Sequence, residues 1–246
     1  MSASTALLRS EVRLFGREPA SVFWILFFPA LLLGVLGLIP AFRDVSEDLD
    51  GRRVIDLYVP IALLTSMVLA SLQAMPVVLS GYRERGILRR LHATPARPSA
   101  LLGAQLVVHA VAVLISGILV IALGRLVFDV PLPREVPGYA LVVLLAVSAA
   151  LATGALVSAL ARTVKAAQAL GMTLFFPMLF ASGVYVPITV LPDAVQWAVA
   201  WTPFGAASLA LDEAAVGDWP SWPYLGVLVA WTVLATSAAA RWFRWE

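Results

Sequence analysis

The sequence has no cysteine, and only one lysine and two histidines occur among its 246 residues. Without cysteine the chain can form no disulfide, no thiolate metal site and no cysteine nucleophile. The two histidines, His92 and His109, are too few for a metal cluster, so we expect no metal here. Charged residues make up only 13% of the chain, against about 25% in soluble domains. A soluble fold of this length would need more polar side chains to cover its surface.

Several motifs that carry nucleotide binding or catalysis are also absent. No G-x-x-x-x-G-K-[ST] loop occurs, and the single lysine, Lys165, follows no glycine-rich loop. No G-x-S-x-G turn occurs, which disfavours a membrane serine hydrolase. The long apolar runs contain no Asp or Glu, where carriers driven by protons or sodium usually place carboxylates. We therefore expect neither an enzyme nor an ion-driven carrier, and no cofactor on this chain.

The hydrophobic residues, 61% of the chain, gather in six long runs without Asp, Glu, Lys or Arg. A helix of about 20 such residues crosses the apolar part of a bilayer, whereas strands of a membrane barrel would give shorter, alternating segments. The sequence thus predicts an all-α integral membrane protein with one transmembrane domain, residues 1–246, and six transmembrane helices. The expected spans are about residues 21–42, 57–81, 99–124, 137–161, 166–187 and 220–240.

Basic residues predict the orientation of these spans. Cytoplasmic loops of membrane proteins hold the excess Lys and Arg, and most of the 17 basic residues share one side if the N-terminus is inside. We therefore expect a bacterial plasma (inner) membrane protein with both termini in the cytoplasm. A seventh uncharged run, residues 194–211, would invert this pattern if it crossed. We expect short outer-leaflet helices there, with Trp197 and Trp201 at the interface.

The residues before the first span, 3–18, predict a short interfacial helix. Arg9, Arg13 and Arg17 recur every four residues and form one stripe along such a helix. Arginine on the polar face favours anionic headgroups. Glu11 and Glu18 make the amphipathic pattern imperfect, so a loose N-terminal tail is the alternative.

His109 lies inside an expected span. An ionisable side chain in a membrane is a functional candidate by default. A neutral histidine bonded to a neighbouring backbone carbonyl is the interpretation we favour, because no second ionisable group lies in the same run.

Residues 82–95 predict a short amphipathic helix between the second and third spans. At 100° per residue Glu84 falls on an apolar face, and four arginines spread over the opposite side. Thr94 precedes Pro95, which disfavours helix and marks the end. Such a helix could lie on anionic lipid or dock on a cytoplasmic partner. Glu84 favours the partner, since a carboxylate gains nothing from anionic lipid.

Three features of the sequence together resemble the ABC-2 type membrane domain of bacterial ATP-driven exporters, in particular the drug-resistance permeases of the daunorubicin type. The segment that ends with Thr94-Pro95 is similar to the family's coupling helix. Phe176-Pro177 and the prolines and tryptophans that follow resemble its fifth span and outer-leaflet helices. Arg17-Glu18-Pro19, followed by Pro29, is similar to its N-terminal helix and first span. The likeness covers nearly the whole chain, although the external loops are too short to form a substrate-selecting domain.

The resemblance implies the partners and the candidate sites. It implies two permease copies, identical or different, with separate ABC ATPase subunits that bind ATP and Mg. Membrane lipid surrounds the permeases, and no nucleic acid is involved. The implied coupling helix comprises Arg83, Glu84, Arg85, Gly86, Leu88, Arg89, Arg90 and Leu91. The implied substrate path at the permease interface offers Thr65, Ser66, Met67, Gln73, Phe175, Phe176, Met178 and Phe180.

Aromatic and methionine side chains suit flat, apolar ligands, so we expect export of a hydrophobic or amphipathic compound such as a drug. An alternative is a permease of the same fold for a lipid or polysaccharide precursor. A membrane scaffold without transport is a third hypothesis, and it would need no ATPase.

Overall fold

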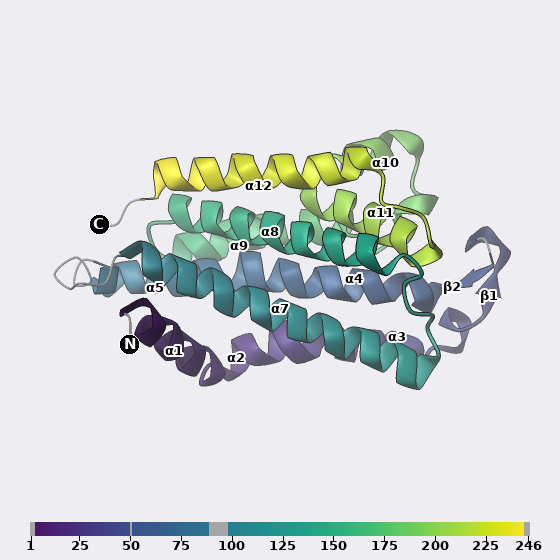
Figure 1. The fold of residues 1–246 in the computed structure, drawn as a ribbon, viewed down its shortest axis with the longest axis horizontal. Coiled ribbons are helices and arrows are strands. Elements are labelled where there is room, and N and C mark those ends of the chain that lie inside the picture. The colour runs from purple at the N-terminus through teal and green to yellow at the C-terminus, as the bar shows by residue number, and fades with distance from the viewer. Residues whose placement is uncertain (1–2, 50, 89–97, 244–246) are drawn as a thin grey trace.

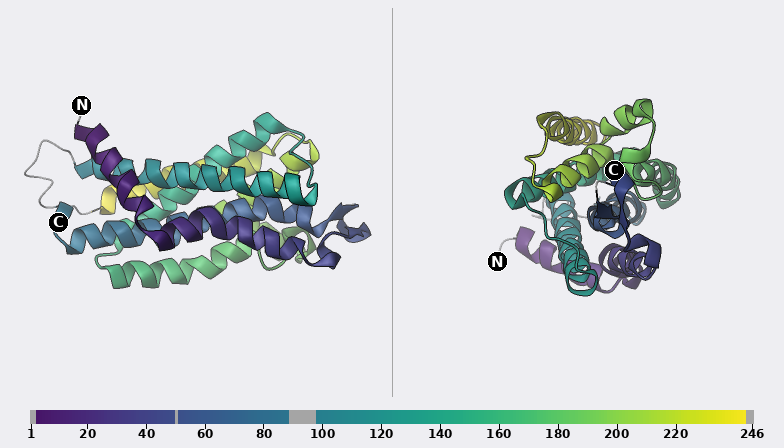
Figure 2. Two further views of the ribbon diagram at one scale, coloured as in Figure 1. Left: turned by 90° about the horizontal axis from the view of Figure 1, so that it is seen from below. Right: turned by 90° about the vertical axis from the view of Figure 1, so that its right-hand side faces the viewer.

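The structure, a computed structural model, describes residues 3–49, 51–88 and 98–243. These residues form an elongated bundle of helices that run roughly along its long axis (Figures 1 and 2). In chain order the elements are α1 (Ala3–Gly16), α2 (Pro19–Val22), η1 (Phe23–Phe27), α3 (Phe28–Gly37), η2 (Pro40–Phe42), β1 (Val45–Ser46), η3 (Glu47–Leu49), β2 (Arg52–Arg53), α4 (Val54–Val68), η4 (Leu69–Ala74), α5 (Met75–Glu84), α7 (Pro98–Phe128), α8 (Val136–Leu160), α9 (Val164–Ala181), η5 (Ile188–Val190), α10 (Asp193–Ala200), α11 (Pro203–Val216) and α12 (Trp222–Trp242).

Six helical stretches of the described residues are long and apolar enough to cross a membrane, which confirms the six predicted spans. They are Pro19–Gly37, Val54–Glu84, Ala100–Phe128, Val136–Leu160, Val164–Ala181 and Trp222–Trp242. Four of the predicted C-terminal bounds differ from the structure by three residues or more; the third span runs to Phe128 rather than to residue 124, and the fifth ends at Ala181 rather than at residue 187. The first span ends at Gly37 rather than at residue 42, because Ile39 is extended before Pro40, as a residue before proline prefers. The second span runs to Glu84 and so includes Arg83, which we had assigned to the next helix.

The bundle has two distinct ends. The two termini lie at one end, together with α1 and the turn between α8 and α9; we call this the terminal end (Figure 1). The short antiparallel pair β1–β2 lies at the other, which we call the hairpin end. There Arg52 makes a two-pronged ion pair with Asp212 of α11, at 2.5 and 3.3 Å. Arg53 bonds Asp56 and the backbone oxygen of Phe128, so the hairpin is tied to α4, α7 and α11.

The first and second spans each contain a π-helical segment, η1 and η4, directly before a proline-bearing helix. Phe28 donates its N–H to the oxygen of Phe23, and Met75 donates to Ala70, each five residues back. Pro29 and Pro76 lie in the first turn of α3 and α5. At this position the absence of a proline N–H costs no hydrogen bond within the helix. The widened turns therefore accommodate the two prolines without ending either span.

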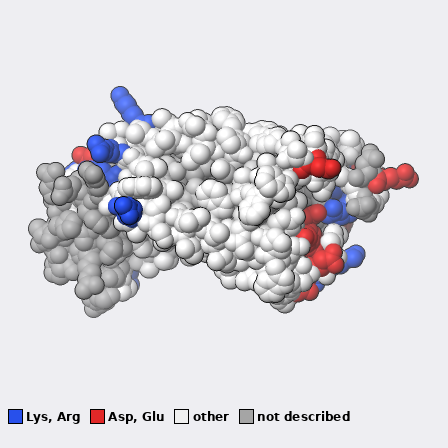
Figure 3. Space-filling model, turned by 90° about the horizontal axis from the view of Figure 1, so that it is seen from above, with Lys and Arg blue, Asp and Glu red and all other residues white. Residues whose placement is uncertain are grey.

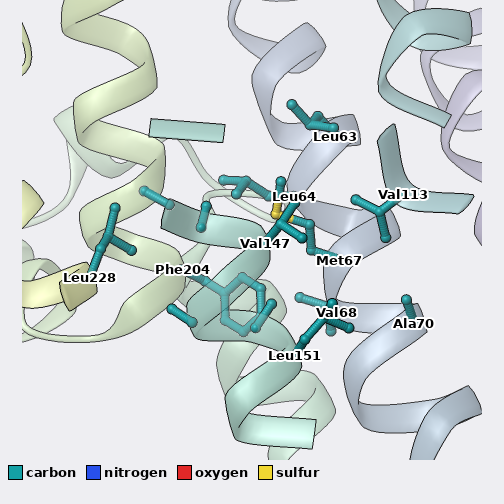
Figure 4. Packing of buried hydrophobic residues seen from close by; sticks show 14 of the residues in the cluster. Leu63, Leu64, Met67, Val68, Ala70, Val113, Val147, Leu151, Phe204 and Leu228 are labelled. Carbon is teal, nitrogen blue, oxygen red and sulfur yellow. The ribbon is translucent and has the colours of Figure 1, made fainter. Parts of the chain in front are cut away.

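The core of the bundle is built around the second span. About 78% of its most apolar window is buried, against 22% for the first and fifth spans. Figure 4 shows Leu64, Met67 and Val68 of this span packed among side chains of α7, α8, α11 and α12. Phe204 of α11 is 1% exposed at the centre of this cluster. The run predicted to lie at the interface thus contributes, through α11, to the core.

Two glycines bring other spans against the carbonyl groups of η4. A Cβ on Gly154 of α8 would lie 2.4 Å from the oxygen of Ser71, and one on Gly171 of α9 would lie 2.2 Å from that of Leu72. Only a residue without a side chain allows such contact between backbones. Helices α8 and α9 therefore pack closely against η4, which is held between them.

Candidate functional site

A cavity of about 580 Å³ lies between the first, second and fifth spans; we call it the 1–2–5 cavity. Its walls come from α2, η1 and α3 on one side, from α4 and η4 on the second, and from α9 and the residues after it on the third. The lining residues are Ala20, Ser21, Trp24, Ile25, Phe28, Leu32, Thr65, Leu69, Gln73, Ala74, Met172, Phe175, Leu179, Val184 and Tyr185. None of them carries a formal charge at neutral pH, so the cavity suits a neutral ligand surface.

Aromatic side chains form much of the cavity wall. The rings of Trp24 and Phe28, one turn apart on the first span, lie 4.7 Å apart between centroids. Phe175 and Tyr185 contribute further rings, and Met172 adds a flexible thioether. Such walls give flat apolar molecules large contact areas and adapt to their shape.

Gln73 supplies an unsatisfied polar group at this wall. Its Nε2 is buried and has no hydrogen-bond partner among the described residues, whereas the hydroxyl of Thr65 donates to the oxygen of Ile61 at 2.9 Å. An amide N–H that is buried without a partner costs about 1–3 kcal/mol. Because this nitrogen is shielded here, the Gln73 side chain would have to turn toward the cavity for a ligand's hydrogen-bond acceptor to recover this energy. Gln73 also lies in η4, and π-helical turns often occur at functional sites.

A second cavity of about 580 Å³ lies between α7, α8 and α12. Its hydroxyl groups are bonded within their own helices: Ser148 donates to Leu144, and Thr232 to Leu228. No unpaired buried polar atom was found among its described lining residues. We therefore take the 1–2–5 cavity as the candidate ligand site.

The structure places only some of the predicted path residues at this cavity. Thr65, Gln73 and Phe175 line it. Ser66 and Met67 face the core, where Ser66 donates to the oxygen of Leu63. Met178 packs against the core, while Phe176 and Phe180 lie exposed on the outer face of α9. The sequence did not single out the other lining residues, among them Ser21, Trp24, Phe28, Met172 and Tyr185.

The predicted helix over residues 83–91 is not continuous in the structure. Arg83 and Glu84 are the last two residues of α5. Gly86 has a φ of 65°, a left-handed conformation that interrupts a helix and suits glycine. Glu84 therefore does not share a helix face with Leu88, which is 1% exposed beyond the turn. The remaining residues of this predicted site, Arg89, Arg90 and Leu91, lie outside the described residues.

Helix α1 is docked on the terminal end through a buried carboxylate. Glu11, 4% exposed, accepts hydrogen bonds from Tyr82 of α5, at 2.8 Å, and from Gln105 of α7. Burial raises the pKa of the Glu11 carboxyl above its ordinary value, although the two hydrogen bonds oppose the rise. His109, one turn from Gln105, shares a 2.9 Å hydrogen bond with the Gln105 backbone oxygen. The predicted carbonyl-bonded histidine is therefore present, packed edge-on against Phe15.

Charges separate the two ends of the molecule. Basic side chains gather at the terminal end, and acidic ones concentrate at the hairpin end (Figure 3). Among the described residues no group of three or more His, Asp or Glu side chains is arranged to hold a metal ion.

The six spans define a multi-pass helical membrane protein, and the 1–2–5 cavity gives it an open, ligand-sized site between three of them. Residues 3–210 match the ABC-2 type transporter family. The chain therefore belongs to this family and is a permease subunit of an ABC transporter. Among curated proteins, none matches the chain.

Proposed function

We propose that this permease subunit exports an uncharged, hydrophobic or amphipathic compound, such as a drug or antibiotic, from a bacterial cell. The observation that carries the proposal is the unpaired amide of Gln73 on the wall of a cavity without charged residues. Such a site favours a planar, apolar molecule that presents a carbonyl or another acceptor. A precursor carrying a diphosphate would find no cation in the described lining, so we place the polysaccharide alternative second.

A second permease subunit, identical or related, would close the 1–2–5 cavity. The first and fifth spans, which bound the cavity, are among the least buried of the six. Phe176 and Phe180 are exposed on the outer face of the fifth span, at 56% and 37%. We propose that this face meets the second subunit, as the family resemblance implies, and that the substrate path runs through the joined cavities.

We propose that a separate ABC ATPase, which binds ATP and Mg, supplies the energy for transport. The described part of the predicted coupling segment, residues 83–88, lies at the terminal end (Figure 1), and in this proposal the segment faces the ATPase and both termini lie in the cytoplasm. The gathering of basic side chains at the terminal end supports this orientation in the plasma membrane. The daunorubicin-type, drug-exporting subtype is the form of the family that we favour.

Efflux of Nile red, a planar neutral dye with a carbonyl group, tests the proposal. Cells that lack other exporters and express the chain with its ATPase should expel the preloaded dye. Replacing Gln73 by Leu should slow efflux about tenfold, since one lost hydrogen bond near 1.4 kcal/mol corresponds to that factor. Gln168→Leu, a change of the same kind on an exposed position of α9 outside the cavity, should leave efflux unchanged.

Three results would contradict this proposal. Efflux that continues with an inactive ATPase would remove the ABC mechanism, and a chain that purifies without any ATPase would favour the scaffold hypothesis. Equal loss of efflux in Gln73→Leu and Gln168→Leu would remove the 1–2–5 cavity as the ligand site.

A further inference from the structure

Arg83 joins the end of the second span to the ends of two other spans. Its Nη1 donates to the backbone oxygen of Ser158, at 3.1 Å, and to that of Ala161. These carbonyls belong to the last turn and C-cap of α8, where helix oxygens have no partner in their own helix. The guanidinium carbon also lies 5.1 Å from the ring centroid of Phe243, directly after α12. A single side chain of α5 thus contacts the terminal ends of α8 and α12.

Glu84 makes the complementary contact with the fifth span. Its Oε1 accepts the backbone N–H of Val164 at 2.9 Å. Val164 is the first residue of α9, and the N-cap residue Thr163 serves a different N–H, that of Ala166. The charges match the helix dipoles, because the cation lies at the C-terminal end of α8 and the anion at the N-terminal end of α9. We call Arg83, Glu84 and these backbone partners the 83–84 clamp.

We infer that Arg83 and Glu84 are positioning residues that transmit movement of the ATPase-facing segment to α8, α9 and α12. The segment follows Gly86, only two residues beyond Glu84. Since the clamp fixes both sides of the turn at residues 161–163, a displacement of the segment would move the fourth, fifth and sixth spans together with the second. The inference rests on the proposed function, because it takes the segment after Gly86 as the ATPase contact.

This assigns Glu84 a role different from docking on the ATPase. A carboxylate that caps α9 needs an acceptor oxygen, which Gln also provides, whereas an ion pair with the ATPase needs the negative charge. Glu84→Gln should therefore preserve the clamp, and Glu84→Ala should break it. The pair of variants separates a local hydrogen bond from a contact between subunits.

Val164→Pro removes the donor of the same bond without touching Glu84. Proline suits the first position of a helix, where the N–H is not needed within the helix. Thr163 already has the extended backbone that a residue before proline requires, with φ −131° and ψ 159°. Val164→Ala is the matched control, because it shortens the side chain and keeps the N–H. Arg241→Ala is the control for Arg83→Ala, since Arg241 is an exposed arginine in the last turn of α12.

The readout is the response of α9 to nucleotide in the complex with the ATPase. Because the chain has no cysteine, a bimane fluorophore attached to Gln168→Cys before the ATPase is added labels a single site, on the exposed face of α9. Its emission is compared between the nucleotide-free complex and the complex trapped with ADP and vanadate. Co-purification of the ATPase and its rate of ATP hydrolysis are measured on the same samples.

Glu84→Ala, Arg83→Ala and Val164→Pro should each cut the emission change by about half or more while the ATPase stays bound and active. Glu84→Gln, Val164→Ala and Arg241→Ala should keep the full change. A full response in Val164→Pro, or an α9 that does not respond to nucleotide in the unaltered complex, would overturn the inference. Loss of ATPase binding in Glu84→Gln would do so too, by showing that the charge serves docking. If no ATPase binds the unaltered chain, the proposed function itself has failed.

Discussion

Glu11 is the carboxylate whose protonation bears on how α1 is held. It is the acceptor that Tyr82 and Gln105 share, and it lies on α1, which also packs against α7 through Phe15 and His109. Burial raises the pKa of the Glu11 carboxyl in the folded protein. Docking of α1 therefore favours the protonated, neutral carboxyl over the carboxylate. The charged residues near it are Arg17 and Glu18, just beyond α1, and Arg85 after α5, which line the same recess as His109 of α7.

The sign of the pH dependence follows from this raised pKa. The contribution of Glu11 to stability is fully present below the pKa that this group has in the unfolded chain, and it is lost as pH rises through the higher folded pKa. We predict that the thermal unfolding midpoint of the purified protein falls as pH rises from below the ordinary pKa of glutamate through the raised pKa of Glu11. Glu11→Gln, which cannot ionise, should flatten the dependence. Glu18→Gln, at an exposed site, should leave it as it is, and a slope unchanged in Glu11→Gln would contradict the prediction.

At the scale of elements, the contact of η4 with α8 and α9 determines how closely the second span is packed. A Cβ atom added to Gly171 would lie 2.2 Å from the backbone oxygen of Leu72. A backbone oxygen cannot move away as a flexible side chain can. We predict that Gly171→Ala lowers the free energy of unfolding by about 1–3 kcal/mol, the usual cost of overpacking. This outweighs the gain of up to about 1 kcal/mol that alanine brings to a helix.

Gly103→Ala provides the control for this effect. Gly103 is also helical, on α7, but nothing lies within 4 Å of the position of its Cβ. Its replacement should leave the unfolding midpoint unchanged or raise it. Equal midpoints for the two alanine variants in a thermal unfolding assay would argue against close contact between α9 and η4.

The sequence was sufficient to predict the spans, because a bilayer demands long uncharged runs that no other structure of this length requires. It could not reveal the π-helical segments η1 and η4. A proline alone predicts a break in the helix, whereas the widened turn that avoids the break depends on packing against neighbours such as Gly154. The amphipathic pattern over residues 83–91 could not show that the helix is interrupted at Gly86, because the left-handed φ of this residue leaves no mark on the hydrophobic periodicity. Nor could Trp24 and Phe28 be assigned to a cavity, because nearly every residue of the first span is apolar and no periodicity separates its faces.

For the whole molecule, the separation of charges predicts which end faces the cytoplasm. Arg162 lies exposed in the turn at the terminal end, and Asp44 lies exposed near the hairpin. In the cysteine-free chain, a single cysteine at either position can be labelled in intact cells with a membrane-impermeant maleimide. We predict labelling of Asp44→Cys and protection of Arg162→Cys until the membrane is opened. The reverse pattern would invert the orientation and remove residues 83–91 from reach of a cytoplasmic ATPase.

The second subunit is the last requirement of the proposed assembly, and burial alone does not locate it. The first, fifth and sixth spans are all poorly buried, at 22%, 22% and 28% of their apolar windows. What distinguishes the face of the first and fifth spans is the 1–2–5 cavity with the unpaired Gln73 amide. In membranes that contain a single chain type, Phe176→Cys on α9 should give a cross-linked dimer with a short bismaleimide. Leu234→Cys, 67% exposed on α12, should give none. Cross-linking through Leu234 alone would place the partner on α12 and leave the cavity facing lipid, because one interface cannot cover both faces.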